Sequence, residues 1–182
     1  MPVKNYYHLS SIYSHLMRSI DYKQWSSYLT DISKEINKDK ISVLELASGT
    51  GEVASFLKNK FGVFTSSDLS LNMLKQFQSD KCDRVCCNFL NLPFKNKFDF
   101  IFTTFDSINY LTKKSMLLSL LKEVNSILRV DGIFTFDASL ENNSLRYFKH
   151  LNRKGKHDGI KYKQTSKYDK KDRIHYNYFE IT

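Results

Sequence analysis

Short apolar runs alternate with helical patterns along most of this sequence, and that alternation constrains the fold more than any other feature. The runs that predict strands are 41–47, 63–68, 84–87, 98–105 and 133–137. The helical patterns occupy 6–36, 52–59, 71–77 and 114–128. Strands and helices in this order form βαβ units, so we predict a Rossmann-like, doubly wound α/β fold with a mostly parallel sheet.

Local signals refine several of these elements. Asp21 and Ser70 precede helical patterns and carry side chains that can cap a helix N-terminus. Asp131-Gly132 predicts a turn before the fifth strand. The apolar residues of 114–128 recur at helical spacing and predict a buried face. The residues predicted for that face are Leu117, Leu118, Leu121, Val124, Ile127 and Leu128.

The pattern changes after Ser144. Residues 160–168 and 174–181 alternate in the manner of strands around a charged turn at 169–172, which predicts a β-hairpin. No helix or strand follows it in this sequence, so we expect an uncovered sheet edge that allows self-association.

We expect one domain over residues 1–182. Its parts would be N-terminal lid helices at 1–40, a Rossmann-like core at 41–140 and a basic β-hairpin extension at 141–182.

The positive charge is concentrated near the end of the sequence. The formal net charge is +9, and residues 146–173 hold eleven Lys or Arg against three Asp. This segment could bind RNA or another polyanion. The alternative, which we favour, is a solvated hairpin whose lysines prevent edge-to-edge aggregation.

Several classes of protein are disfavoured. No apolar stretch resembles a signal peptide or approaches membrane-spanning length. Cys82, Cys86 and Cys87 are an odd, clustered set, which indicates reduced thiols and a cytoplasmic protein. The five histidines are scattered, so we expect no metal site.

A glycine turn follows the first predicted strand. Ala47, Gly49 and Gly51 allow the backbone to turn tightly and a ligand to approach the main chain, although a purely structural turn can look the same. Asp68 ends the second strand, where a carboxylate can accept both hydroxyl groups of a ribose. The alternative is that Asp68 only caps the next helix, for which Ser70 is better placed.

The glycine turn also limits which nucleotide-type ligands are expected to bind there. Ala54 stands where a dinucleotide fingerprint has its third glycine, and no Gly-Lys-Ser/Thr follows, so the turn is not a P-loop. A smaller adenosine ligand without a pyrophosphate fits better.

Five ordered motifs carry a family resemblance: LELASGTGE, SSDLSLNML, NFLNLPF, FDFIFTTFDSINYL and LRVDGIFTFD. Together they resemble class I S-adenosylmethionine-dependent methyltransferases, in particular a small bacterial branch with DYxxW before the glycine turn and DSxNYL after the fourth strand. The resemblance runs from about Tyr6 to Thr182 and implies S-adenosylmethionine as the cofactor.

The resemblance also implies a cofactor site. The glycine turn would lie under the methionine portion, Asp68 would bind the ribose, Phe105 would lie beside the sulfonium, and Tyr13 of the lid would close over the cofactor. Near the adenine, Asn88 replaces the usual aspartate. The residues implied are Tyr13, Glu45, Ala47, Gly49, Gly51, Asp68, Leu69, Asn88, Phe89 and Phe105.

The acceptor side would lie just beyond the fourth strand. Asp106, Asn109 and Tyr110 are the candidates there, and Asp106 is the best one to position or deprotonate the acceptor. The alternative is that Asp106 caps the following helical turn. Neither Asn-Pro-Pro-Tyr nor Pro-Cys is present, which disfavours methylation of adenine or glutamine amides and of cytosine C5.

We therefore expect methyl transfer to an oxygen, nitrogen or carbon of a small molecule. Family members continue beyond the hairpin with a helix and a β pair, so we also expect a C-terminally truncated fold. Two alternatives stay open. One is a truncated, non-catalytic protein that binds S-adenosylmethionine or S-adenosylhomocysteine, and the other is an RNA methyltransferase.

Overall fold

A five-stranded parallel sheet forms the centre of the computed structural model, which describes residues 7–77, 81–95 and 97–182. Its strands are β1 (Ser42–Leu46), β2 (Val63–Asp68), β3 (Asp83–Cys86), β4 (Phe98–Thr103) and β5 (Leu128–Phe136). They lie in the order β3-β2-β1-β4-β5, and every neighbouring pair is parallel. The predicted doubly wound α/β fold is therefore confirmed.

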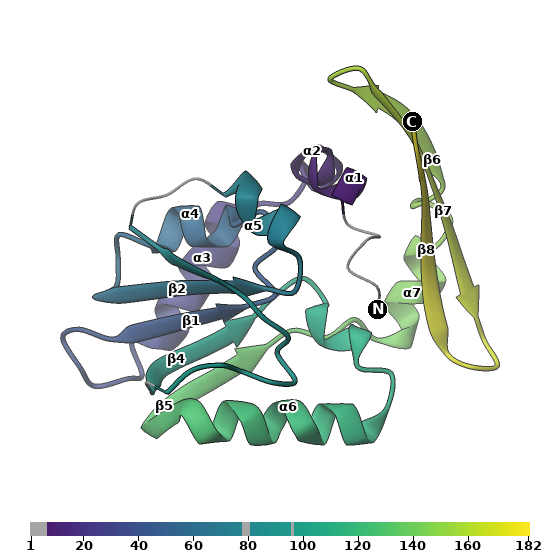
Figure 1. Ribbon diagram of the computed structural model, residues 1–182. Helices are drawn as coiled ribbons and strands as arrows, with labels where there is room; N and C mark the ends of the chain where they lie inside the picture. The colour runs from purple at the N-terminus through teal and green to yellow at the C-terminus, as the bar shows by residue number, and fades with distance from the viewer. Residues whose placement is uncertain (1–6, 78–80, 96) are drawn as a thin grey trace.

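Helices cover both faces of this sheet (Figure 1). α3 (Tyr22–Ser33) and α4 (Glu52–Leu57) pack on one face, α5 (Leu71–Gln76) lies beside β2 and β3, and α6 (Lys114–Ile127) packs on the other face. Both predicted caps are present. The Asp21 carboxylate accepts from the Gln24 N–H at 2.9 Å, and the Ser70 hydroxyl accepts from the Met73 N–H at 3.4 Å.

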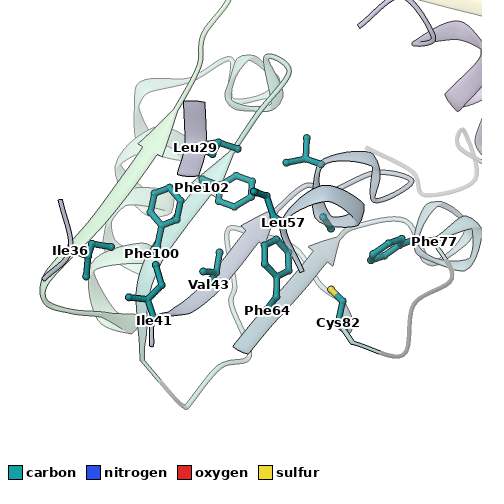
Figure 2. Close-up of a cluster of buried hydrophobic side chains, with 12 residues drawn as sticks. Leu29, Ile36, Ile41, Val43, Leu57, Phe64, Phe77, Cys82, Phe100 and Phe102 are labelled. Atoms are coloured by element: carbon teal, nitrogen blue, oxygen red, sulfur yellow. The ribbon is translucent and has the colours of Figure 1, made fainter. Parts of the chain in front are cut away.

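Strand alternation divides the core between the two faces. Val43, Phe100 and Phe102 point toward α3 and α4, and all three are fully buried (Figure 2). Leu44 and Ile101, the next residues along the same strands, point toward α6. Because both faces are covered, all of β4 and all of β1 except Ser42 are buried, and most of these residues are apolar. The buried polar exceptions are Glu45, Asp99 and Thr103.

The predicted buried face of α6 was partly wrong. Val124 and Ile127 are buried, but the third fully buried position is Leu120, which the prediction omitted. Leu118 and Leu121 are 48% and 39% exposed. The apolar pattern of this helix is wider than the stripe that meets the sheet, so spacing alone did not identify its centre.

The predicted turn at Asp131-Gly132 is instead an irregularity inside β5, where the register against β4 shifts. Asp131 has a φ of 64°. A Cβ at Gly132 would come within 2.9 Å of the carbonyl oxygens of Arg129 and Asp99. Glycine is therefore required because the neighbouring main chain is too close for any side chain.

A second, antiparallel sheet follows α7 (Glu141–Tyr147). It contains β6 (Arg153–His157), β7 (Ile160–Asp169) and β8 (Ile174–Ile181), in the order β6-β7-β8. The predicted hairpin of β7 and β8 is confirmed. β6 was not predicted, because its residues RKGKH carry no apolar alternation.

Two short helices, α1 (Tyr7–Ser10) and α2 (Tyr13–Leu16), lie between the core and the second sheet (Figure 1). Leu9, Ile12 and Leu16 pack against Met73 of α5 and Tyr162 of β7. One face of the hairpin is thus covered by α1 and α2, which the sequence did not predict. The predicted helical start at Tyr6 lies outside the described residues. None of the helices described is long and apolar enough to cross a bilayer.

Candidate functional site

The loop between β1 and α4 adopts a strained left-handed path. Ala47, Gly49 and Gly51 all have positive φ, at 54°, 57° and 77°. Gly51 has a packing role, because a Cβ there would come within 2.2 Å of the Phe77 ring. A Cβ at Gly49 would meet only the Tyr13 ring, at 3.6 Å. Gly49 therefore faces the lid across the side of the loop on which a ligand could lie.

A pocket lies beneath the lid at the carboxyl ends of β1 and β4. Its volume is about 30 Å³, far below the roughly 300–1,000 Å³ of a typical ligand-binding cleft. Five of the predicted cofactor residues line it, namely Tyr13, Glu45, Ala47, Gly49 and Phe105. The lining residues that were not predicted are Tyr22, Ser48, Thr50, Glu52, Val53, Thr104 and Ser107.

Glu45 is a buried acid at the base of this pocket. Only 2% of the residue is exposed, and its carboxylate accepts a long hydrogen bond of 3.3 Å from the Ser66 hydroxyl. Burial raises the pKa of Glu45 to about 8, and the nearby charge of Asp68 adds to the effect. In the part of the chain that the structure describes, no cation lies within ion-pair distance of Glu45.

The Asp68 carboxylate links the loops that follow β1 and β2. Its Oδ2 accepts from the Gly49 N–H and its Oδ1 from the Ser70 N–H, both at 2.8 Å. Burial raises the pKa of Asp68, while these two N–H groups oppose the increase. The side-chain cap of α5 is Ser70, so the alternative that Asp68 is merely that cap is wrong. Asp68 fixes the turn after β2 to the glycine loop.

Helix α2, part of the predicted lid, is hydrogen-bonded to the glycine loop. The Ser14 hydroxyl donates to Thr50 Oγ1 at 3.2 Å, and the half-buried Tyr13 ring lines the pocket. Burial raises the pKa of Tyr13 well above its usual value. α2 therefore places a neutral phenol directly over Gly49.

An aromatic group forms the wall beside β4. The Tyr22 and Trp25 rings meet the Phe105 ring edge-on, with centroid distances of 5.5 and 5.2 Å. Burial raises the pKa of Tyr22 to about 12. The DYxxW motif of the sequence contains Tyr22 and Trp25, so it held the signal for this wall, although no role was predicted for either residue.

The residues predicted to lie near the adenine are more exposed to solvent than those that line the pocket. Leu69 is 41% exposed, and Phe89 is half-buried against the core cluster that faces α6. Asn88 is exposed, and its side-chain carbonyl accepts from the Leu90 N–H at 2.9 Å. The oxygen that we expected to face an adenine amine already shapes a local turn. Its second lone pair is what a ligand could still use.

The three residues predicted for the acceptor side differ in their contacts and exposure. Asp106 has a φ of 60° and makes no side-chain cap to the following helical turn, which rules out the cap alternative. The Asn109 amide donates to the Ser139 carbonyl at 2.8 Å and accepts from the Ser139 N–H at 2.9 Å. Asn109 thus holds the loop after β5 in place. Tyr110 is 51% exposed.

Asp137, at the end of β5, was not predicted. Its Oδ2 accepts from the Asp106 N–H at 3.1 Å. Partial burial, followed by the charge of Asp137, raises the pKa of Asp106 to about 6. The sequence contained a signal, because Asp137 closes the last predicted strand of the parallel sheet, where ligands bind.

Three buried oxygen atoms lack a hydrogen-bond partner among the described residues: Ser48 Oγ, Thr103 Oγ1 and Asp137 Oδ1. Ser48 lines the pocket, and Thr103 and Asp137 lie at the ends of β4 and β5. Unpartnered buried polar atoms are costly, so their presence at one edge of the sheet indicates a place for a polar ligand. Among the described residues, no cluster of His, Cys, Asp or Glu is arranged to hold a metal ion.

Comparisons with known proteins point to one family. Residues 43–132 match the family model described as "Methyltransferase domain". A Bacillus subtilis protein named "Putative methyltransferase YqeM" is 32% identical over 138 residues, covering 72% of this chain and 54% of the relative. The chain spans about half the length of the curated relatives it matches.

Solved structures show the same fold over nearly the whole chain. An S-adenosylmethionine-dependent methyltransferase from Clostridium acetobutylicum has a TM-score of 0.74 at 24% identity, covering 95% of this chain and 78% of its own. The sugar N-methyltransferase KedS8 from Streptoalloteichus has a TM-score of 0.71 at 17% identity, covering 93% and 76%. The fold is the Rossmann-like fold of S-adenosylmethionine-dependent methyltransferases.

Proposed function

We propose that this protein is a class I S-adenosylmethionine-dependent methyltransferase that acts on a small-molecule acceptor. The family match, the curated relative and the solved structures support a methyltransferase, and they support S-adenosylmethionine as its cofactor. The matched residues 43–132 contain the glycine loop, Asp68 and Asp106.

The observation that carries this proposal is the buried, uncompensated carboxylate of Glu45 in a pocket walled by a glycine loop and an aromatic group. Isolated buried charges are unfavourable, and a carboxyl group avoids the cost by staying protonated. A ligand with a cationic group would pair with the ionised carboxylate of Glu45, so this side chain would no longer need to stay protonated. S-adenosylmethionine carries an ammonium and a sulfonium, and the unpartnered Ser48 hydroxyl beside Glu45 offers a further hydrogen bond.

The neighbouring residues suit the other parts of the same molecule. Asp68 uses one lone pair on each oxygen for a backbone N–H, so both oxygens can still accept from ribose hydroxyl groups. Leu69 follows directly and is exposed enough to pack against adenine. Phe105 and the Tyr22 ring supply electron-rich surfaces that favour a sulfonium.

Binding must be coupled to movement of the lid. The pocket of about 30 Å³ cannot hold an adenosyl cofactor while the Tyr13 ring covers Gly49. We propose that α2 swings away, with loss of the Ser14–Thr50 hydrogen bond, and then closes over the bound cofactor. Closure would exclude water from the methyl group.

The bound cofactor supplies an activated methyl group, and the protein supplies alignment and a base. Asp106 is the proposed base. With a pKa of about 6 it is ionised at neutral pH but still basic enough to take a proton from an acceptor. Asp137 holds the Asp106 main chain in position, and Asn109 anchors the loop after β5 beside it.

A two-part experiment tests this function. Cofactor binding is measured by calorimetry, and turnover is measured as S-adenosylhomocysteine formed from a panel of small amines, alcohols and phenols. We expect Asp106→Asn to retain the cofactor affinity and to lose turnover by at least about a hundredfold. Binding without turnover on any acceptor would instead favour a non-catalytic cofactor-binding protein. Absence of binding would contradict the proposal altogether.

A further inference from the structure

The β6–β8 sheet has two chemically different faces. Its inner face carries Tyr162 and Phe179, which pack against α1 and α2. The opposite face is called the outer face here. Its residues are Lys154 and Lys156 of β6, Lys161, Lys163, Thr165, Lys167 and Asp169 of β7, and Ile174, Tyr176, Tyr178 and Glu180 of β8.

Like charges face each other directly on the outer face. Lys154 lies opposite Lys163, and Lys156 lies opposite Lys161. Such pairs destabilise a sheet, because the side chains of opposed residues are close together. Glu180 forms an ion pair with Lys163 at 2.9 Å. Over the described parts of the chain, no carboxylate lies within ion-pair distance of the other four lysines.

Protection against aggregation does not account for this arrangement. Lysines that block edge-to-edge pairing belong on edge strands, where unpaired main-chain groups are exposed. Three of the five outer-face lysines, Lys161, Lys163 and Lys167, lie on β7, which is the central strand. At Lys163 the main chain of β7 is paired with β6 and β8, and at Lys161 it is paired with β6 and hydrogen-bonded to Thr182, so the charges of these two lysines protect no edge. They form a row, with alternate residues about 7 Å apart.

Aromatic rings complete the outer face. Tyr178 is 55% exposed, and its ring lies nearly parallel to that of Tyr176, with 11° between the planes and 6.0 Å between the centroids. Thr165 and Lys167 lie directly opposite these two tyrosines. Exposed aromatic rings beside a row of lysines are the combination that binds single-stranded nucleic acid, through stacking on bases and contacts with phosphates.

We propose that the outer face of the β6–β8 sheet binds single-stranded nucleic acid. The lysines of β6 and β7 contact successive phosphates, and Tyr176 and Tyr178 stack on bases. The alternation of the strands keeps this surface on the side of the sheet that faces away from the lid. The site is separate from the cofactor pocket and does not depend on the proposed methyl transfer.

Fluorescence anisotropy with a labelled single-stranded RNA of about twelve nucleotides tests the proposal on the full chain. We expect binding that weakens with salt, with a log–log slope that falls by about 1.4 in Lys156→Gln/Lys161→Gln, or about 0.7 for each lysine. The matched control is Lys114→Gln/Lys122→Gln, which removes the same charge from exposed positions on α6. We expect its slope to match that of the wild type.

A second variant separates stacking from charge. We expect Tyr176→Ala/Tyr178→Ala to lose at least about fivefold in affinity for the single strand and to keep its affinity for a duplex of the same length. Equal losses for both RNAs, equal losses in the α6 control, or binding only to heparin or anionic vesicles would overturn the proposal. Calorimetry with S-adenosylmethionine on the same variants should be unchanged, so a folding defect would be detected.

Discussion

The two sheets of this protein differ in how their faces are covered. The parallel sheet is covered by helices on both faces, and its central strands β1 and β4 are almost fully buried. The antiparallel sheet is covered on one face only, by two short helices, and its other face carries lysines. We infer that the first supplies most of the stability and the cofactor site, whereas the second supplies a surface and a support for the lid.

The largest expected difference lies in the cores. Phe102 is fully buried between β4 and the helices α3 and α4, so Phe102→Ala should reduce the free energy of unfolding by about 3–5 kcal/mol. Thr165→Ala on the outer face of β7 should change it by less than about 0.5 kcal/mol. Urea denaturation measures both. Similar losses for the two variants would remove the proposed distinction between the sheets.

A second effect comes from the buried acid of the parallel sheet. The pKa of Glu45 is raised in the folded state, so the folded chain binds more protons than the unfolded chain between pH 4.5 and about 8. Stability due to this group is therefore present at low pH and lost as the pH rises through that window. At pH 8, Glu45→Gln should be more stable than the wild type by on the order of 3 kcal/mol.

Thermal unfolding from pH 5 to pH 8 measures this contrast. The variant should lack that part of the pH dependence which Glu45 causes. A wild type and variant with parallel pH profiles would show that Glu45 is not protonated in the folded chain. Lys163→Gln, in the exposed sheet, should leave the shape of the pH profile unchanged and serves as the control.

A third, smaller effect concerns the junction between the two regions. Leu16 is buried between α5 and the inner face of the second sheet, so Leu16→Ala should cost about 2 kcal/mol. The loss should be local. Amide hydrogen exchange should become faster in β6–β8 and stay slow in β1 and β4. Uniform acceleration over both sheets would mean that they unfold as a single unit.

The smallest effect is expected at the exposed ion pair. Lys163 and Glu180 are 2.9 Å apart, but their side chains are 58% and 69% exposed. Glu180→Gln should therefore change the free energy of unfolding by less than about 1 kcal/mol. It should also tighten RNA binding, because it removes the carboxylate that pairs with Lys163 on the outer face. Weaker RNA binding in this variant would count against the proposed surface.

The same contrast explains how much could be predicted from the sequence. Four of the five strands of the parallel sheet were predicted to within two residues, because burial on both faces favours largely apolar runs such as 98–103. β5 begins five residues before its predicted start at Ile133. β6 was missed because its residues are polar and its partner lies in a later part of the chain. Which α6 residues meet the sheet also depends on tertiary packing, and the error at Leu118 and Leu120 follows from that.

The candidate site was predictable where it follows strand ends and less so where it depends on contacts. Glu45, Gly49 and Phe105 follow or end apolar runs, and they do line the pocket. The bonds from Asp68 to two main-chain N–H groups carry no sequence signature. Nor does the close approach of the Phe77 ring to Gly51, which gives this glycine a packing role as well.

The most direct test of the proposed site is the number of protons released when S-adenosylmethionine binds. Calorimetry at pH 7 in buffers of different ionisation enthalpy measures it. We predict binding with release of close to one proton in the wild type, because a cationic ligand lowers the pKa of Glu45 from about 8, and little release in Glu45→Gln. Absence of binding at near-millimolar ligand, or equal proton release in the two proteins, would contradict the placement of the cofactor over Glu45.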